Sequence, residues 1–187
     1  MSAAKKIAKL NPWCHTDVKE WLLQPDQVAL YVADIASSVS AAKGCDAADL
    51  SILVVGVGFS SNAHALVCDK GFRSVVVTDI EAESIAFQEA LFSGSPRKPA
   101  ILEDDLLDSK LDRGKFDIIV DSSCTDVFIR QHVGQAAFSA IGDLLAPGGV
   151  VLCISMFHKP WKRLAAPATW RSFPRRPSSP FLVQKPR

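Results

Sequence analysis

Residues 50–79 read LSILVVGVGFSSNAHALVCDKGFRSVVVTD, and this stretch decides the fold. It begins with a continuous apolar run that ends in glycine, which is typical of a strand buried on both faces of a parallel sheet. Residues 60–70 then have a helical pattern, and a second apolar run ends at Asp79. The stretch therefore predicts a strand, a glycine turn, a crossover helix and a second parallel strand.

The turn Gly56-Val57-Gly58 is the first candidate ligand site. Glycine has no Cβ, so the backbone can turn tightly there and approach a ligand closely. The helix that follows offers unpaired N–H groups to an electron-rich ligand. Asp79, at the end of the second strand, can accept hydrogen bonds from two ribose hydroxyls. Together these residues predict a nucleoside-containing cofactor, without saying which one.

Strand and helix patterns continue to alternate after Asp79, which predicts a doubly wound, mostly parallel α/β sheet. We expect one domain, with an N-terminal helical cap at 1–49, a cofactor-binding core at 50–155 and a C-terminal segment at 156–187. The expected further strands are 100–102, 116–121 and 150–155; the expected helices are 17–23, 26–40, 81–92 and one within 125–145; and an antiparallel strand pair is expected from 169–173 and 181–185.

Ligands of an open parallel sheet lie beyond the carboxyl ends of its strands, and several of these ends carry a carboxylate here. Asp79, Asp105 and Asp121 each follow an apolar run. Such acids would repel a pyrophosphate, and the glycine turn has no lysine and no G-x-x-x-x-G-K-[ST] pattern. The sequence therefore favours a cofactor with ribose hydroxyls, an exocyclic amine and a positive charge.

Composition excludes several other classes of protein. With 187 residues, 48% of them hydrophobic, and a net charge of +1, the chain has the composition of an ordinary globular domain, not of a general nucleic-acid binder. No apolar run reaches the roughly 18 residues of a membrane span. The five cysteines are scattered, so we predict neither a metal site nor a disulfide framework. The N-terminus lacks a signal-like apolar region, and we expect a cytoplasmic or nuclear location.

Five motifs between residues 50 and 155 together resemble the class I S-adenosylmethionine-dependent methyltransferases. They are 54–60 with the glycine turn, 77–80 with the acidic strand end, the acidic 103–108, the fourth strand at 116–121, and the turn into the fifth strand at 145–151. The resemblance implies a Rossmann-like methyltransferase fold and S-adenosylmethionine as cofactor.

Within that class, residues 116–126 (FDIIVDSSCTD) and 154–163 (ISMFHKPWKR) look most like the eukaryotic elongation factor 1 alpha lysine methyltransferases. That group has an acid–lysine–glycine–threonine–leucine–aspartate run after the fourth strand. This chain has Ser122-Ser123 in place of the lysine and glycine, and Phe59 in place of a usual asparagine. The resemblance implies methyl transfer to a protein lysine or another amine.

The resemblance also implies roles for single residues. Asp121 and Asp126 become the candidate catalytic residues, since a carboxylate can orient the acceptor amine. Phe157 and Trp161 would border the acceptor pocket with Asp126. The implied cofactor contacts are Gly56, Val57 and Gly58 at the methionine part, Asp79 at the ribose, Ile80 against the adenine, Asp105 and the Leu106 N–H at the adenine edge, and Asp121 at the methionine amino group.

Three functions remain open at this point. The first is methyl transfer, to a protein or to a small-molecule acceptor. The second is NAD-dependent oxidoreduction, which the sequence disfavours: Ser61 stands where the third glycine of G-x-G-x-x-G belongs, and Tyr31, the only tyrosine, lies outside the α/β core. The third is a non-catalytic binding module that keeps the fold. The sequence does not indicate the oligomeric state.

Overall fold

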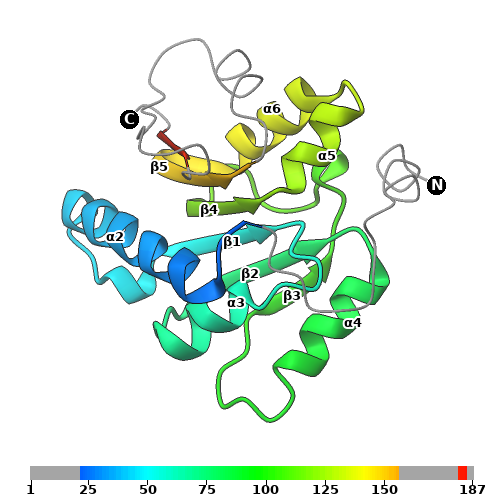
Figure 1. Ribbon diagram of the computed structural model, residues 1–187. Coiled ribbons are helices and arrows are strands. Elements are labelled where there is room, and N and C mark those ends of the chain that lie inside the picture. Colours follow the sequence, from blue (N-terminus) through cyan, green and yellow to red (C-terminus); the bar gives the residue numbers. More distant parts are fainter. Residues whose placement is uncertain (1–21, 156–180, 185–187) are drawn as a thin grey trace.

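A computed structural model describes residues 22–155 and 181–184 (Figure 1). Its centre is one sheet with the strand order β3-β2-β1-β4-β5-β6. The first five of these strands are parallel to their neighbours, and β6 runs antiparallel to β5. The strands are β1 (Ser51–Val55), β2 (Ser74–Asp79), β3 (Ala100–Glu103), β4 (Phe116–Ser122), β5 (Leu145–Ile154) and β6 (Phe181–Gln184).

The central strands are apolar on both faces because helices cover both faces. In β1, Ile52 and Val54 join one hydrophobic cluster, while Leu53 and Val55 join the cluster on the opposite face. All four side chains are almost completely buried. This is the environment that selects continuous Val, Ile and Leu runs in parallel sheets.

The helices divide between the two faces of the sheet (Figure 1). The first cluster contains residues of α2 (Pro25–Lys43), α3 (Asn62–His64), the π-helical turn η2 (Ala65–Asp69), and Phe92 at the end of α4 (Ala82–Leu91). The second cluster contains residues of η3 (Leu106–Asp108), α5 (Cys124–Arg130) and α6 (Gly134–Leu144). The short turn η1 (Ala47–Asp49) precedes β1. None of the helices within 22–155 is long and apolar enough to cross a membrane.

The predicted doubly wound α/β sheet is confirmed, whereas the predicted C-terminal strand pair is not shown by the described residues. Residues Phe181–Gln184 do form a strand, and it pairs with β5, with Val150 opposite Gln184 and Cys153 opposite Phe181. The other predicted member, 169–173, lies outside the described residues. Of the N-terminal cap, the second helix is confirmed as α2. Residues 17–21 of the first lie outside the described part, and Leu22 and Leu23 are not helical.

Two crossover connections also differ from the predicted single helices. The segment after the glycine turn passes from α3 into η2, in which the Lys70 N–H donates to Ala65 O (3.0 Å), five residues back. The segment expected as one helix within 125–145 is two helices, α5 and α6, separated at His132 with φ +61°. Apolar periodicity alone does not encode either break.

Candidate functional site

The carboxyl ends of β1, β2 and β4 lie at the same height in the sheet. Val55 is paired with Thr78 of β2 on one side and with Asp121 of β4 on the other. The residues that follow Val55 therefore lie at the point where the strand order reverses between β1 and β4. Open α/β sheets bind ligands at such a switch point.

The glycine turn has one glycine packed against the protein and one that faces open space. Both Gly56 (φ +55°) and Gly58 (φ +56°) are left-handed. A Cβ on Gly56 would lie 2.7 Å from the Cβ of Cys124, and nearer still to its Sγ, whereas a Cβ on Gly58 would meet no atom of the described residues within 4 Å. Val57 is buried, and its N–H donates to Thr78 O (3.0 Å). The turn is thus fixed to β2 and α5, with Gly58 on its open side.

The Asp79 carboxylate lies directly beside this turn. Its Oδ2 accepts a hydrogen bond from the Gly58 N–H (2.7 Å), and its Oδ1 accepts one from the Glu81 N–H (2.9 Å). Burial raises the pKa of Asp79, and the two backbone donors oppose that rise. Each carboxylate oxygen can accept more than one hydrogen bond. The side chain therefore keeps acceptor capacity for hydroxyl groups of a ligand. Contact of Asp79 with a ribose, and of the half-buried Ile80 that follows it with an adenine, stays a prediction.

The third strand brings Asp105 and Leu106 to the same edge of the sheet. The Asp104 N–H donates to Asp79 O (2.9 Å), which joins the two strand ends. Asp105 caps η3, since its Oδ1 accepts from the Leu107 N–H (3.0 Å). Leu106 is buried in the second hydrophobic cluster. One Asp105 oxygen is thus committed to a local cap, and contact of this residue with an adenine amine stays a prediction.

The two candidate catalytic carboxylates are turned into the protein. Asp121 is 0% exposed and accepts hydrogen bonds from the Thr125 N–H (3.2 Å), the Thr125 hydroxyl and the Cys153 thiol (3.6 Å). Burial raises its pKa to about 6. Asp126 is 3% exposed and accepts from the Ser155 hydroxyl. Direct contact with an acceptor stays a prediction for both residues, while their described contacts tie α5 to β4 and β5.

Sequence reasoning missed Cys124, the first residue of α5, which packs against the glycine turn. Its side chain is half-buried against Gly56. Burial raises the pKa of its thiol well above the usual value, and the charges of Asp121, Asp79 and Asp126 raise it further. The group is therefore a neutral thiol between the three carboxylates. The signal in the sequence was its place directly after Ser122-Ser123, at a strand end.

Gln88 of α4 was also missed. It is 0% exposed, and its Nε2 donates to Gly58 O (3.0 Å) and to Ser60 O (2.8 Å). The neighbouring Phe87 packs edge-on against Phe59, with ring centroids 5.4 Å apart. Ser84, one turn earlier, is buried too. A buried polar pair four residues apart on one helix is the signal that points to this contact.

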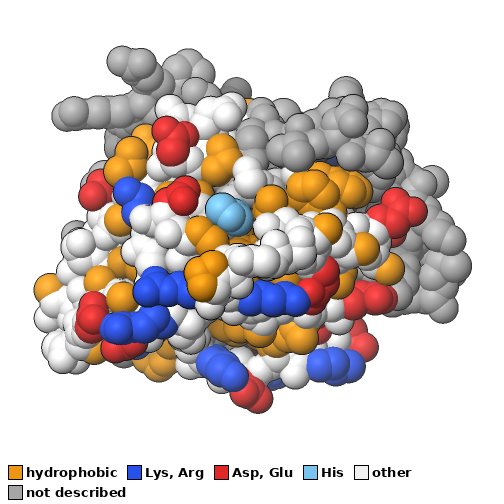
Figure 2. All heavy atoms as spheres, turned by 90° about the horizontal axis from the view of Figure 1, so that it is seen from below, with side chains coloured by type: hydrophobic (Ala, Val, Ile, Leu, Met, Phe, Trp, Pro, Cys, Tyr) orange, Lys and Arg blue, Asp and Glu red, His pale blue; other side chains and the backbone are white. Residues whose placement is uncertain are grey.

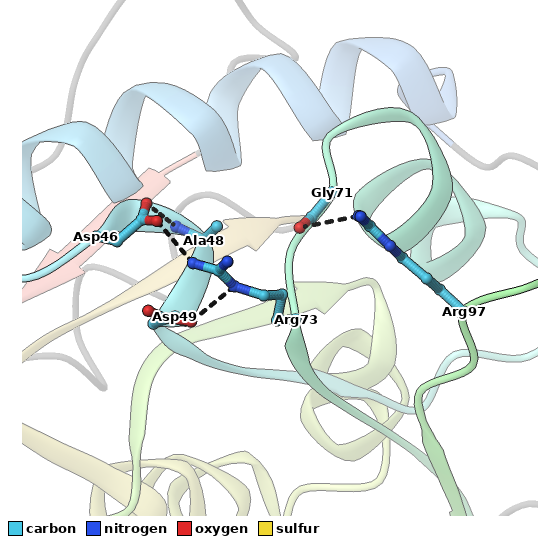
Figure 3. Close-up of polar contacts among 6 residues, drawn as sticks. All are labelled: Asp46, Ala48, Asp49, Gly71, Arg73 and Arg97. Atoms are coloured by element: carbon cyan, nitrogen blue, oxygen red, sulfur yellow. Dashed lines mark hydrogen bonds and ion pairs between the residues drawn. The ribbon is translucent and has the colours of Figure 1, made fainter.

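A separate hollow of about 320 Å³ lies at the opposite edge of the sheet, where β2 and β3 begin, and contains none of the predicted site residues. It is lined by Val67, Phe72, Arg73, Val75, Pro96, Arg97, Lys98 and Pro99. Figure 3 shows Arg73 reaching Asp46 (2.6 Å) and Asp49 (2.7 Å), and Arg97 pointing at Gly71 O (3.5 Å). Figure 2 shows a face on which Lys and Arg side chains alternate with Asp and Glu. Because this hollow contains neither the glycine turn nor Asp79, it is not the site that the sequence predicts for the cofactor.

Phe157 and Trp161, predicted to border the acceptor pocket, lie outside the described residues. Within the described part, the structure brings together Gly56, Val57, Gly58, Asp79, Cys124 and Gln88. An open glycine face beside a carboxylate with spare acceptor capacity fits a ribosyl group with hydroxyls.

Comparison with known protein families gives one match. The family model described as a methyltransferase domain matches residues 53–153, from β1 to β5. No curated protein sequence matches the chain significantly.

Solved structures share the fold at low sequence identity. A candidate S-adenosyl-L-methionine-dependent methyltransferase from Methanococcus maripaludis has a TM-score of 0.60 and 13% identity, over 92% of this chain and 98% of its own. The bifunctional kinase-methyltransferase WbdD has a TM-score of 0.65 and 15% identity, over 96% of this chain and 45% of its own. The plantazolicin methyltransferase BpumL, solved with SAH, has a TM-score of 0.56 and 13% identity, over 74% of this chain and 51% of its own. The chain thus spans nearly all of the first and about half of the other two.

Proposed function

The chain belongs to the methyltransferase domain family, and from this premise we propose that it transfers the methyl group of S-adenosylmethionine to a protein lysine or another amine. The observation that supports cofactor binding most directly is the open glycine turn beside the Asp79 carboxylate. We further propose that the enzyme acts in the cytoplasm or nucleus.

The cofactor fits the donor set of this site. S-adenosylmethionine supplies a methyl group already activated on a sulfonium, so the chain has to position an acceptor rather than create a nucleophile. Asp79 would accept from the ribose hydroxyls, and Gly58 leaves room for the methionine part. The neutral Cys124 thiol puts no charge of its own next to the turn.

An amine acceptor is supported by the charges around the strand ends. Asp79 ends β2, Asp121 lies at the end of β4 and Asp126 lies in the first turn of α5, so these acids make the carboxyl ends of the strands electronegative at neutral pH. Such a field attracts a cationic lysine side chain to the strand ends and disfavours anionic acceptors. The resemblance of residues 116–126 to the elongation factor lysine methyltransferases is a second, independent reason to propose a protein acceptor.

A calorimetric titration with S-adenosylmethionine and, separately, with NAD tests the cofactor. We expect saturable binding of S-adenosylmethionine and no binding of NAD. Asp79→Ala should weaken the affinity at least about tenfold, because a hydrogen bond to a charged group contributes about 1.5–3 kcal/mol. Asp104→Ala is the matched control, since this half-buried acid follows the neighbouring strand and its Oδ1 serves the Lys110 N–H.

The acceptor requires a separate experiment. Purified protein and radiolabelled S-adenosylmethionine are incubated with a cell extract, and the labelled products are digested to amino acids. Methylated lysine is the expected product. Label found only in small molecules, with none in protein, would refute the protein acceptor and leave methyl transfer itself intact.

A second candidate function is a non-catalytic module that binds the cofactor. It is favoured by the burial of both candidate catalytic carboxylates and by Ser122-Ser123 in place of lysine and glycine. In that case calorimetry shows S-adenosylmethionine binding, and no label reaches protein or small molecules in any extract.

A further inference from the structure

The backbone of Gly58 is held from two sides. Its N–H donates to Asp79 Oδ2 at the end of β2, and its C=O accepts from Gln88 Nε2 of α4. The same Gln88 amide also donates to Ser60 O. One side chain therefore fixes both ends of the segment 58–60, on the open side of the glycine turn.

The orientation of the Gln88 amide follows from these partners. The two described partners of its Nε2 are carbonyl oxygens, which only accept hydrogen bonds. The NH₂ group must face them, because the opposite orientation would place three acceptors together. The donor assignment thus rests on the backbone rather than on a choice between two equivalent orientations.

The Gln88 side chain has one buried polar atom without a described partner. Its Oε1 has no hydrogen-bond partner among the described residues, and neither does Asn62 Oδ1 at the start of α3. A buried unpaired acceptor destabilises the folded state; a methionine of similar shape would avoid that cost but would remove the donors to the Gly58 and Ser60 carbonyls. The benefit of a glutamine here is the geometry that it imposes on residues 58–60.

From these contacts we propose that Gln88 is a positioning residue for the cofactor. By fixing the Gly58 carbonyl it limits rotation about the Gly58 backbone bonds, which keeps the Gly58 N–H on Asp79 Oδ2 and so orients the carboxylate toward the ribose. The proposal rests on the proposed cofactor site and adds a residue outside it. Because Gly58 has no side chain, and a Cβ there would meet no atom of the described residues within 4 Å, side-chain packing does not restrain these torsions within the described part.

Calorimetry with S-adenosylhomocysteine tests the proposal, using Gln88→Met in the full chain. The variant removes both donors and keeps the approximate volume, and we expect the affinity to fall at least about tenfold. Adenosine should lose affinity by a similar factor, since the effect acts on the ribose side. The measurement is made at low temperature, with the folded state verified by circular dichroism.

Ser84→Ala is the matched control. Ser84 lies one turn before Gln88 on the same buried face of α4, at 4% exposure. Its truncation disturbs the helix packing but makes no change at the Gly58 or Ser60 carbonyl. We expect its affinity for S-adenosylhomocysteine to equal that of the wild type. A role in stability alone would lower the free energy of unfolding of both variants and leave both affinities unchanged.

The outcomes separate the positioning role of Gln88 from the cofactor assignment. Wild-type binding with an unchanged Gln88→Met affinity overturns the positioning role and leaves the cofactor assignment in place. Absence of wild-type binding overturns the proposed function. In that case, hydrogen exchange tests whether Gln88 fixes the backbone of residues 58–60. Faster amide exchange confined to residues 58–62 in Gln88→Met supports this role, and unchanged exchange refutes it. If Gln88→Met does not fold, Gln88→Asn, whose shorter amide loses reach to the carbonyls, is judged by the same criteria.

Discussion

At the scale of single residues, Ser123 adopts a conformation that favours glycine. Its φ is left-handed at +65°, and it stands where the group that residues 116–126 resemble has a glycine. Its N–H and hydroxyl both donate to Ile154 O, at 2.8 and 3.3 Å. The serine therefore keeps a glycine conformation and partly offsets the strain with a side-chain hydrogen bond.

Ser123→Gly should raise the free energy of unfolding by up to about 1 kcal/mol. Glycine removes a left-handed strain of about 1–2 kcal/mol, and the loss of the serine hydroxyl hydrogen bond cancels part of this gain. Urea unfolding measures the change. Ser122→Gly is the control, because Ser122 lies in β4 and a glycine there should destabilise the protein. A destabilised Ser123→Gly would mean that the Ile154 contact outweighs the strain.

The two glycines of the turn should respond differently to alanine. Gly56→Ala places a methyl group into Cys124 and should destabilise the protein by about 1–3 kcal/mol, beyond the cost of the left-handed backbone. Gly58→Ala has open space and should lose only the backbone cost. Urea unfolding of both variants checks the order, and equal losses would contradict the packing of Cys124 against Gly56.

At the scale of elements, β4, α5 and β5 are joined by buried carboxylates rather than by apolar contacts alone. Asp121 at the end of β4 holds Thr125 of α5 and Cys153 of β5, and Asp126 of α5 holds Ser155. The folded state holds the Asp121 proton up to a pKa of about 6, against a reference of 3.8. Folding therefore retains this proton over a pH range in which the unfolded chain has lost it.

The sign of the pH effect follows. Since the folded state binds more protons between about pH 4 and 6, the free energy of unfolding should fall as the pH rises through that window. Relative to Asp121→Asn, which stays neutral, the wild type should lose on the order of 2 kcal/mol between pH 4 and 7. Urea unfolding of both proteins across this range gives the difference. A difference that grows in favour of the wild type at higher pH would contradict the burial of this carboxylate.

Elements also show where sequence patterns succeed and where they do not. The strands around Leu53 and Ile119 could be predicted because burial on both faces requires continuous apolar runs. The π-helical turn η2 and the break at His132 could not, because both depend on local hydrogen-bond choices that leave apolar spacing unchanged. Gln88 was missed because a polar side chain on a helix is normally expected to face solvent.

At the scale of the whole molecule, the strand order explains why the proximity of the glycine turn and Asp79 could be predicted from sequence. Gly56 and Asp79 follow adjacent strands, so their proximity is a result of parallel pairing. Cys124 and Gln88 come from α5 and α4, whose approach to the turn depends on tertiary packing. The pairing of β6 with β5 likewise could not be predicted, because any nearby strand could have been its partner.

Ligand binding should stabilise the whole domain. At a concentration of one hundred times its Kd, S-adenosylhomocysteine should raise the free energy of unfolding by about 2.7 kcal/mol, since only the folded state forms the site. Thermal unfolding with and without the ligand measures this as a higher Tm. NAD at the same concentration is the control, and an equal rise with NAD would contradict the cofactor assignment.

The antiparallel pairing of β6 also has a consequence for the order of events during synthesis. The five parallel strands β1 to β5 lie within residues 51–154, whereas the strand that covers the outer edge of β5 is translated only after residues 156–180. Until then, the apolar β5 presents unpaired backbone groups along that edge. A nascent chain at this stage has a nearly complete sheet with an edge open to mispairing, and this interval is when chaperone protection would matter most.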